Sequence, residues 1–134
     1  APGIQRYLCG TPAILGLAAL ECGVDTLLAA EPVGGLAALR AKSVALGELF
    51  IARVEARCAD HGLVLASPRE AALRGSQVCF AHAELGYPVV QALIARGVVG
   101  DFRAPDILRF GFTPLYTRYV DVWDAAEQLG QVLD

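Results

Sequence analysis

The sequence VVGDFRAPDILRFGF, residues 98–112, contains two apolar segments on either side of a turn that includes proline. Val98–Phe102 and Ile107–Phe112 are each short, rich in β-branched and aromatic residues, and bounded by turn-forming residues, as is typical of strands. Only Arg103–Asp106 separates them. The spacing therefore predicts an antiparallel hairpin with a four-residue connection.

Outward from this hairpin, the apolar pattern changes between periods typical of helices and of strands. Two further strands are predicted, at Leu63–Ser67 and Gln77–His82, where the apolar residues alternate or form short runs. Helices are predicted at four places: from Thr11-Pro12 to about Cys22 with Gly23 as its end, after Gly34-Gly35 up to a stop at Gly62, from Pro88 to Arg96, and at the C-terminal end around Tyr119–Leu133. This order predicts an α+β fold, in which helices cover one face of a mainly antiparallel sheet.

Length and composition limit the class of protein. The 134 residues suffice for one domain with a hydrophobic core, so we expect a single domain over 1–134. Hydrophobic residues make up 55% and the net charge is −3, which excludes a basic nucleic-acid surface and a disordered chain. The apolar stretch Pro12–Ala30 contains Glu21 and Asp25, which argues against a membrane span. Because the sequence has no methionine and is unusually apolar, we expect it to be a piece of a longer chain.

The cysteines and histidines do not form a recognisable metal motif. The four cysteines are far apart, and no two of them form a C-x-x-C pair. We therefore predict no metal site and reduced, mostly buried thiols. His61 precedes a glycine at the predicted end of the long helix, where a favourable contact with the helix dipole is the ordinary interpretation. His82 closes a strand and could face an active site, but a solvated or hydrogen-bonded role is more frequent at a strand end.

Arg109 is the unusual residue of its strand, because it lies between Leu108 and Phe110 in an apolar run. A guanidinium held there needs an anionic partner, since burial without one is costly. Two interpretations are equally supported by the residues alone: a ligand carboxylate, or an ion pair with a nearby acid of the same chain.

Cys9-Gly10-Thr11-Pro12 is a second candidate site. Glycine permits close approach of the backbone, and a Thr hydroxyl beside the free N–H groups of a helix N-terminus can bind an anion. Simple helix capping by Thr11 is the more frequent use of this pattern. Lys42 is the only lysine, and its position within the long helix favours an ordinary surface role.

Several segments together resemble the C-terminal part of the kynureninase family. They are Gly100–Tyr116 with the following Arg118–Trp123, Tyr7–Pro12 with its Ala/Leu-rich helix, and Arg74–His82. These segments span nearly the whole chain in order. An Arg followed by Pro and Tyr before an acidic helix is shared more loosely with related class V aminotransferase-like enzymes.

The resemblance implies the small C-terminal domain of the aspartate-aminotransferase fold, with residues 1–33 leading in from a large domain. It implies a cytoplasmic, homodimeric enzyme that uses pyridoxal 5'-phosphate to hydrolyse L-kynurenine to anthranilate and L-alanine. Arg109 would bind the substrate α-carboxylate with Gly10 nearby. Thr11 would lie near the cofactor phosphate of the neighbouring subunit, or near the aryl end of the substrate.

The same resemblance implies that this chain holds no catalytic residue. The family's Schiff-base lysine, its ring-stacking aromatic residue and the acid that pairs with the pyridinium nitrogen belong to the large domain. We therefore expect the 134-residue chain alone to be inactive and to bind the cofactor weakly. Two alternatives remain: a domain of a sister class V enzyme, such as a cysteine desulfurase or an aminotransferase, or a free-standing interaction module with Arg109 in a structural role.

Overall fold

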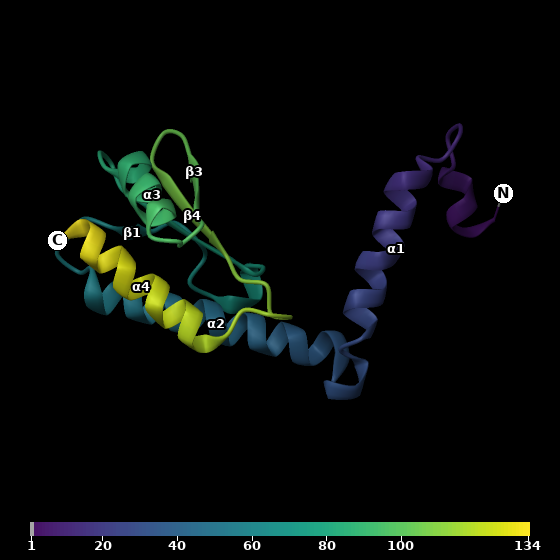
Figure 1. Ribbon diagram of the computed structural model, residues 1–134, viewed down its shortest axis with the longest axis horizontal. Coiled ribbons are helices and arrows are strands. Elements are labelled where there is room, and N and C mark those ends of the chain that lie inside the picture. Colours follow the sequence, from purple (N-terminus) through teal and green to yellow (C-terminus); the bar gives the residue numbers. More distant parts are fainter. Residues whose placement is uncertain (1) are drawn as a thin grey trace. The chain divides into compact units, whose positions relative to one another are not determined.

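The computed structural model describes residues 2–134 and divides the chain into two compact units, 1–38 and 39–134. Figure 1 labels the helices and strands along the chain. The order of the main elements is helix, long helix, strand, strand, helix, strand, strand, helix. This order and the α+β class confirm the predictions from the sequence.

The first unit contains a 3-10 turn, η1 (Gly3–Tyr7), the helix α1 (Ile14–Leu28) and a second 3-10 turn, η2 (Glu31–Val33). The predicted start of α1 was wrong: Ala13 precedes the first helical residue, and no side chain caps the helix. Its predicted end was also wrong, because α1 continues through Gly23 to Leu28. Leucine and alanine on both sides favour the helix strongly enough to carry one glycine.

The long helix α2 (Gly35–Arg57) confirms the predicted period, with one apolar face in the core. Leu46, Phe50, Val54 and Cys58 are all buried, whereas Leu36 is exposed. The helix ends at Arg57, earlier than predicted, and a turn leads to Gly62, whose φ of +71° suits glycine.

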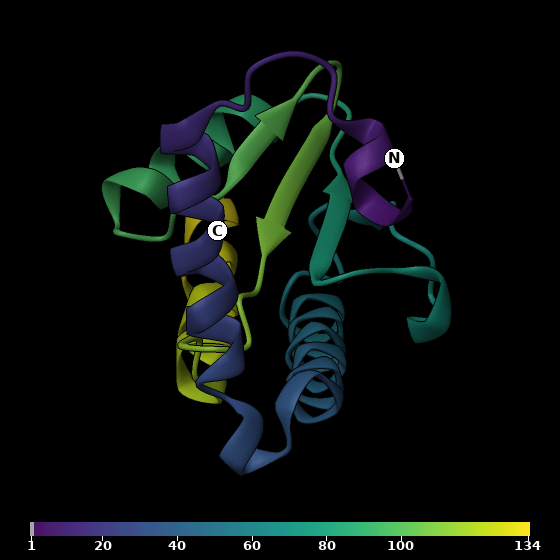
Figure 2. The same cartoon turned by 90° about the vertical axis from the view of Figure 1, so that its right-hand side faces the viewer.

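The sheet has four antiparallel strands in the order β1-β2-β4-β3, and Figure 2 shows β4 between β2 and β3. The strands are β1 (Val64–Leu65), β2 (Gln77–Ala81), β3 (Asp101–Arg103) and β4 (Ile107–Gly111). The hairpin β3–β4 is confirmed, although Arg103 pairs with Ile107, so the connection has three residues, 104–106, and not four.

One face of the sheet packs against helices, which confirms the predicted layers. Val78 and Phe80 of β2 and Leu108 and Phe110 of β4 are buried in this face, because alternate residues of a strand point to the same side. They share one core with residues from α2, from α3 (Gly86–Ala95) and from α4 (Tyr119–Leu133). We call this the inner face, and the opposite side the outer face.

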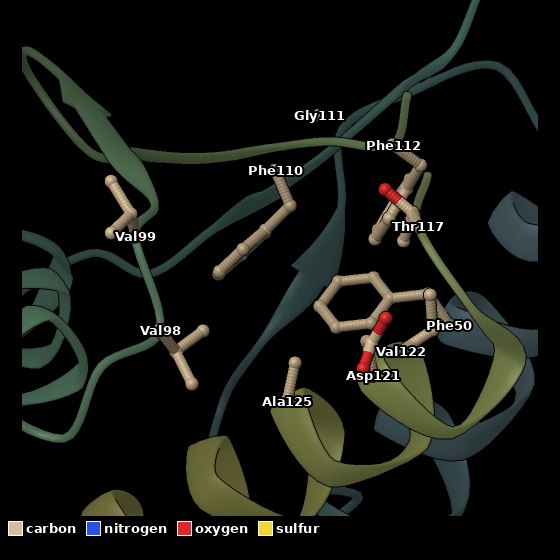
Figure 3. Close-up of a pocket in the computed structure, with 10 residues that line it drawn as sticks. All are labelled: Phe50, Val98, Val99, Phe110, Gly111, Phe112, Thr117, Asp121, Val122 and Ala125. Carbon is tan, nitrogen blue, oxygen red and sulfur yellow. The ribbon is translucent and has the colours of Figure 1, made fainter. Parts of the chain in front are cut away.

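Phe50 of α2 lies at the centre of the core. Its ring centroid is 4.9 Å from that of Phe110 and 5.1 Å from that of Phe112. Figure 3 shows these rings beside a small, partly open pocket of about 130 Å³, which Val98, Val122 and Ala125 also line. No helix among residues 2–134 is both long and apolar enough to span a bilayer.

Candidate functional site

Arg109 lies on the outer face of the sheet. Its neighbours Leu108 and Phe110 are buried on the inner face, so the alternation of the strand turns the Arg109 side chain away from the core. The side chain keeps 34% of its surface exposed. The sequence therefore placed Arg109 in the correct strand, but its side chain is half-exposed and not enclosed by the apolar run.

An ion pair holds one arm of the Arg109 guanidinium. Asp101 is its direct cross-strand neighbour in the hairpin, and Nη2 of Arg109 donates to Oδ2 of Asp101. Arg103 also contacts this carboxylate, with its Nη2 2.8 Å from Oδ2 of Asp101. The ion pair with an acid of the same chain, which was one of the two interpretations of Arg109, is thus present. Nε and Nη1, which carry three of the five N–H donors of the guanidinium, form no hydrogen bond within residues 2–134.

Beside Arg109 the outer face is hollowed. One hollow of about 370 Å³ is lined by Arg109, Asp101 and Gly100 together with Val99, Gln77 and Gly111. A second, of about 410 Å³, continues past Gln77 and Gly111 to Thr113 and Pro114. We call the two together the outer groove. A cationic group with free donors at one end of an open groove suits an anionic ligand such as a carboxylate.

Two residues of the outer groove were missed by sequence reasoning. Asp101 and Gln77 carried no motif, and their contribution depends on which strands pair and in which register. The alternation in Gln77–Ala81 could have shown that Gln77 and Cys79 share a face. It could not have shown that this face continues across β4 to Arg109, because Cys79 pairs with Arg109 only through the β2–β4 ladder.

Cys79 lies next to Arg109 on the outer face but is occupied by local hydrogen bonds. Nε2 of Gln77 donates to Sγ of Cys79 at 3.2 Å, and the Cys79 backbone N–H donates to Oγ of Ser67 at 2.8 Å. The prediction of mostly buried thiols holds for Cys58, is half met by Cys79, and is wrong for Cys9 and Cys22, which are exposed. Burial raises the pKa of the Cys58 thiol.

Gly10 and Thr11 belong to the first unit and are described apart from the outer groove. Both are exposed, and they lie in the loop between η1 and α1. Gly10 has a φ of +90°, and a side chain built there would meet nothing within 4 Å. The capping role considered for Thr11 is wrong. Thr11 makes no side-chain cap of α1, whose N-cap is Ala13, and its side chain is exposed.

The remaining candidate residues have structural partners. Nε2 of His61 lies 3.2 Å from Oδ1 of Asp134, and Nδ1 of His82 accepts hydrogen bonds from the backbone N–H groups of Glu84 and Leu85. His82 therefore follows the ordinary interpretation, whereas the helix-end position expected for His61 is wrong, because α2 already ends at Arg57. Lys42 lies in α2 and is not among the residues of the outer groove. Within residues 2–134, no three His, Cys, Asp or Glu side chains are grouped to hold a metal.

Comparison with known proteins decides between the families considered. Residues 39–129 match the model of the kynureninase C-terminal domain. The chain belongs to the kynureninase family. The matched residues lie within the second compact unit, which carries Arg109 and the outer groove.

Individual kynureninases are similar over nearly the whole chain. A kynureninase of Pseudomonas fluorescens is 58% identical over 132 residues, which are 98% of this chain and 30% of that protein. Kynureninases of Burkholderia mallei (strain SAVP1) and Burkholderia pseudomallei (strain K96243) are each 55% identical over 133 residues, 99% of this chain and 31% of theirs. The chain therefore spans about a third of the length of these curated kynureninases. Its similarity to them includes the first unit, which the family model does not match.

Proposed function

We propose that this chain is the C-terminal part of an enzyme that hydrolyses L-kynurenine to anthranilate and L-alanine. The observation that carries the proposal is the 58% identity to a protein named kynureninase over 98% of the chain. Residues 1–33 would lead in from a large domain. The intact enzyme would be a cytoplasmic homodimer, as the resemblance implies.

Within this enzyme, we propose that Arg109 binds the α-carboxylate of the substrate. The support is geometric: the guanidinium opens onto the outer groove, and Nε and Nη1 lie outside the bond to Asp101. A planar guanidinium can donate two parallel hydrogen bonds to a carboxylate, which fixes orientation as well as position. Asp101 restrains the arm that the ligand does not use, and Arg103 binds the same carboxylate of Asp101.

The cofactor of the proposed enzyme is pyridoxal 5'-phosphate, and this chain would contribute only to holding its phosphate. Thr11 is assigned to the cofactor phosphate of the neighbouring subunit, or alternatively to the aryl end of the substrate, and Gly10 is assigned to the substrate; both residues are exposed. When bound, the cofactor supplies an electron sink for cleavage of the bond next to the γ-carbonyl. The only lysine, Lys42, has no part in the assignment.

Orientation is therefore the contribution of this chain to the reaction. A substrate held by its α-carboxylate keeps its carbonyl carbon in a fixed place relative to the groups of the large domain. Such positioning lowers the barrier, because the geometry required for reaction is reached before the chemical step. Loss of a charged partner at such a site costs about 2–5 kcal/mol.

The test uses the intact enzyme with pyridoxal phosphate and L-kynurenine, and follows anthranilate fluorescence. We expect rapid release by the unsubstituted enzyme and a fall of about a hundredfold in kcat/KM for Arg109→Ala, which corresponds to about 2.7 kcal/mol. Arg69→Ala is the matched control, because Arg69 is exposed and pairs with Glu55 outside the outer groove. Its activity should be unchanged.

Two results would contradict the proposal separately. Unchanged kcat/KM in Arg109→Ala would remove Arg109 from the carboxylate site. An intact enzyme that binds the cofactor but releases no anthranilate would keep the family and assign the activity to a sister reaction.

A further inference from the structure

Gly111 is the point at which the two hollows of the outer groove meet. Gly111 and Gln77 line both hollows, and they are cross-strand partners between β2 and β4. Arg109 stands at one end, two residues before Gly111 on the same face of β4. The floor of the groove next to the guanidinium is therefore a residue without a side chain.

The backbone does not require glycine at this position. Gly111 lies outside the left-handed region, and a Cβ built on it would meet nothing within 4 Å. Gly100, which also lines the groove, differs: a Cβ there would come within 3.1 Å of the Phe110 ring. Packing thus explains the small residue at 100 but not at 111.

The strand itself would favour a larger residue at 111. Glycine lacks a side chain to pack on the sheet, and β-branched residues are the better strand formers. The preceding residue, Phe110, is buried in the inner face and packs against Phe50, which Figure 3 shows, so by strand alternation a side chain at 111 would point to the outer groove and not to the core. Glycine within a strand often marks a close approach by a ligand.

We propose that Gly111 determines specificity: its missing side chain leaves room for the carbon skeleton of an amino-acid ligand whose carboxylate is bound by Arg109. The inference rests on the proposed function, because it assumes that Arg109 binds the carboxylate of the ligand. Both hollows of the outer groove are lined by Gly111, and the second continues beyond it, away from Arg109. A ligand held by the guanidinium therefore extends over Gly111. A side chain there would occupy the same volume.

The test compares Gly111→Ala and Gly111→Val in the intact enzyme. We expect KM for L-kynurenine to rise about tenfold or more in Gly111→Val and less in Gly111→Ala, with kcat changed less than KM, because the added methyl groups obstruct binding. The melting temperature should stay at that of the unsubstituted enzyme. Gly75→Val is the matched control, since Gly75 also has open space and an unrestricted backbone but does not line the groove.

Unchanged KM in both Gly111 variants would overturn the inference. A lower melting temperature together with lost activity in both would overturn it too, because it would show that another part of the protein fills the groove. Arg109→Ala, measured in parallel, separates the two claims. If kcat/KM falls in Arg109→Ala while KM is unchanged in Gly111→Val, the proposed function stands and only the role of Gly111 in specificity is rejected.

If the intact enzyme does not turn over L-kynurenine, the proposed function fails. The role of Gly111 is then tested by the dissociation constant for L-kynurenine, which is measured in place of KM. Equilibrium dialysis of L-kynurenine then compares the unsubstituted protein with Gly111→Val. Weaker binding by the variant supports the role of Gly111. Equal binding, or no binding to the unsubstituted protein, overturns it.

Discussion

At the scale of single residues, Arg109 shows how a charge is placed by strand alternation and then restrained by its neighbours. The inward turn of Leu108 and Phe110 leaves Arg109 on the outer face. Asp101 then occupies one arm of the guanidinium across the hairpin. Both interpretations raised by the sequence are therefore compatible, since an ion pair at Nη2 leaves donors for a ligand.

Arg109→Lys should fail in the intact enzyme although it keeps the charge. An ammonium is a point charge and cannot reproduce both the bond to Asp101 and a two-point contact with a carboxylate. We expect kcat/KM for L-kynurenine to fall at least about tenfold, measured by anthranilate release. Arg69→Lys is the control for the same change at an exposed ion pair. Normal activity of Arg109→Lys would mean that charge alone suffices.

At the scale of elements, the start of α4 depends on one acid. Oδ2 of Asp121 accepts a hydrogen bond from the backbone N–H of Arg118 at 2.7 Å, and Oδ1 accepts one from Nη2 of Arg118 at 2.6 Å. The Arg118 side chain and backbone lower the pKa of Asp121 below the ordinary value of 3.8. Asp121 thereby holds the first turn of the helix that supplies Val122 and Ala126 to the core.

Asp121→Asn should destabilise the chain in a way that depends on pH. The pKa of Asp121 is lower in the folded state, so its contribution is complete above about pH 4 and is lost as the pH falls through the folded value. In urea unfolding, the free energy of unfolding of the variant should be lower than that of the unsubstituted chain at pH 7. The difference should shrink below pH 4.

The control for this variant is Asp124→Asn, at an exposed acid of the same helix. Its unfolding should follow that of the unsubstituted chain. A difference for Asp121→Asn that stays constant from pH 7 to pH 3 would show that the carboxylate charge does not stabilise the start of α4.

At the scale of the whole molecule, this chain contains an apolar helix, α1, that buries none of its residues. All residues of α1 are exposed, including Leu15 at 87% and Ile14 at 74%. A helix that is apolar on all sides is normally buried. This fits a chain that spans about a third of the length of its kynureninase relatives, in which further sequence is available to cover α1.

The 134-residue chain by itself should be inactive. Lys42 is the only lysine, it lies in α2, and it does not line the outer groove with Arg109. We expect no anthranilate release from L-kynurenine, and no cofactor adduct by mass spectrometry after incubation with pyridoxal phosphate and borohydride reduction. The intact enzyme is the positive control. A stoichiometric adduct on Lys42 would show that this chain has a cofactor site of its own.

The local periods of the sequence were sufficient for the kind and order of the elements, the antiparallel hairpin and the strand position of Arg109. These features depend on residues close together in the chain, through alternation, helical spacing and turn residues. Local reasoning was less accurate at element ends. Thr11 and Gly23 looked like helix boundaries, yet α1 begins at Ile14 and runs through Gly23, because the helix propensity of the surrounding residues outweighs one glycine.

The sequence by itself determined the α+β class, the helix-covered face of the sheet, and the family, through the residues around Gly100–Tyr116. Only the tertiary structure decided that Asp101 pairs with Arg109 and that Gln77 and Gly111 form the floor beside it. The physical reason is the register between strands. Hydrogen bonding between β2 and β4, which are distant in sequence, brings Cys79 opposite Arg109 and Gln77 opposite Gly111, and no local pattern encodes that alignment.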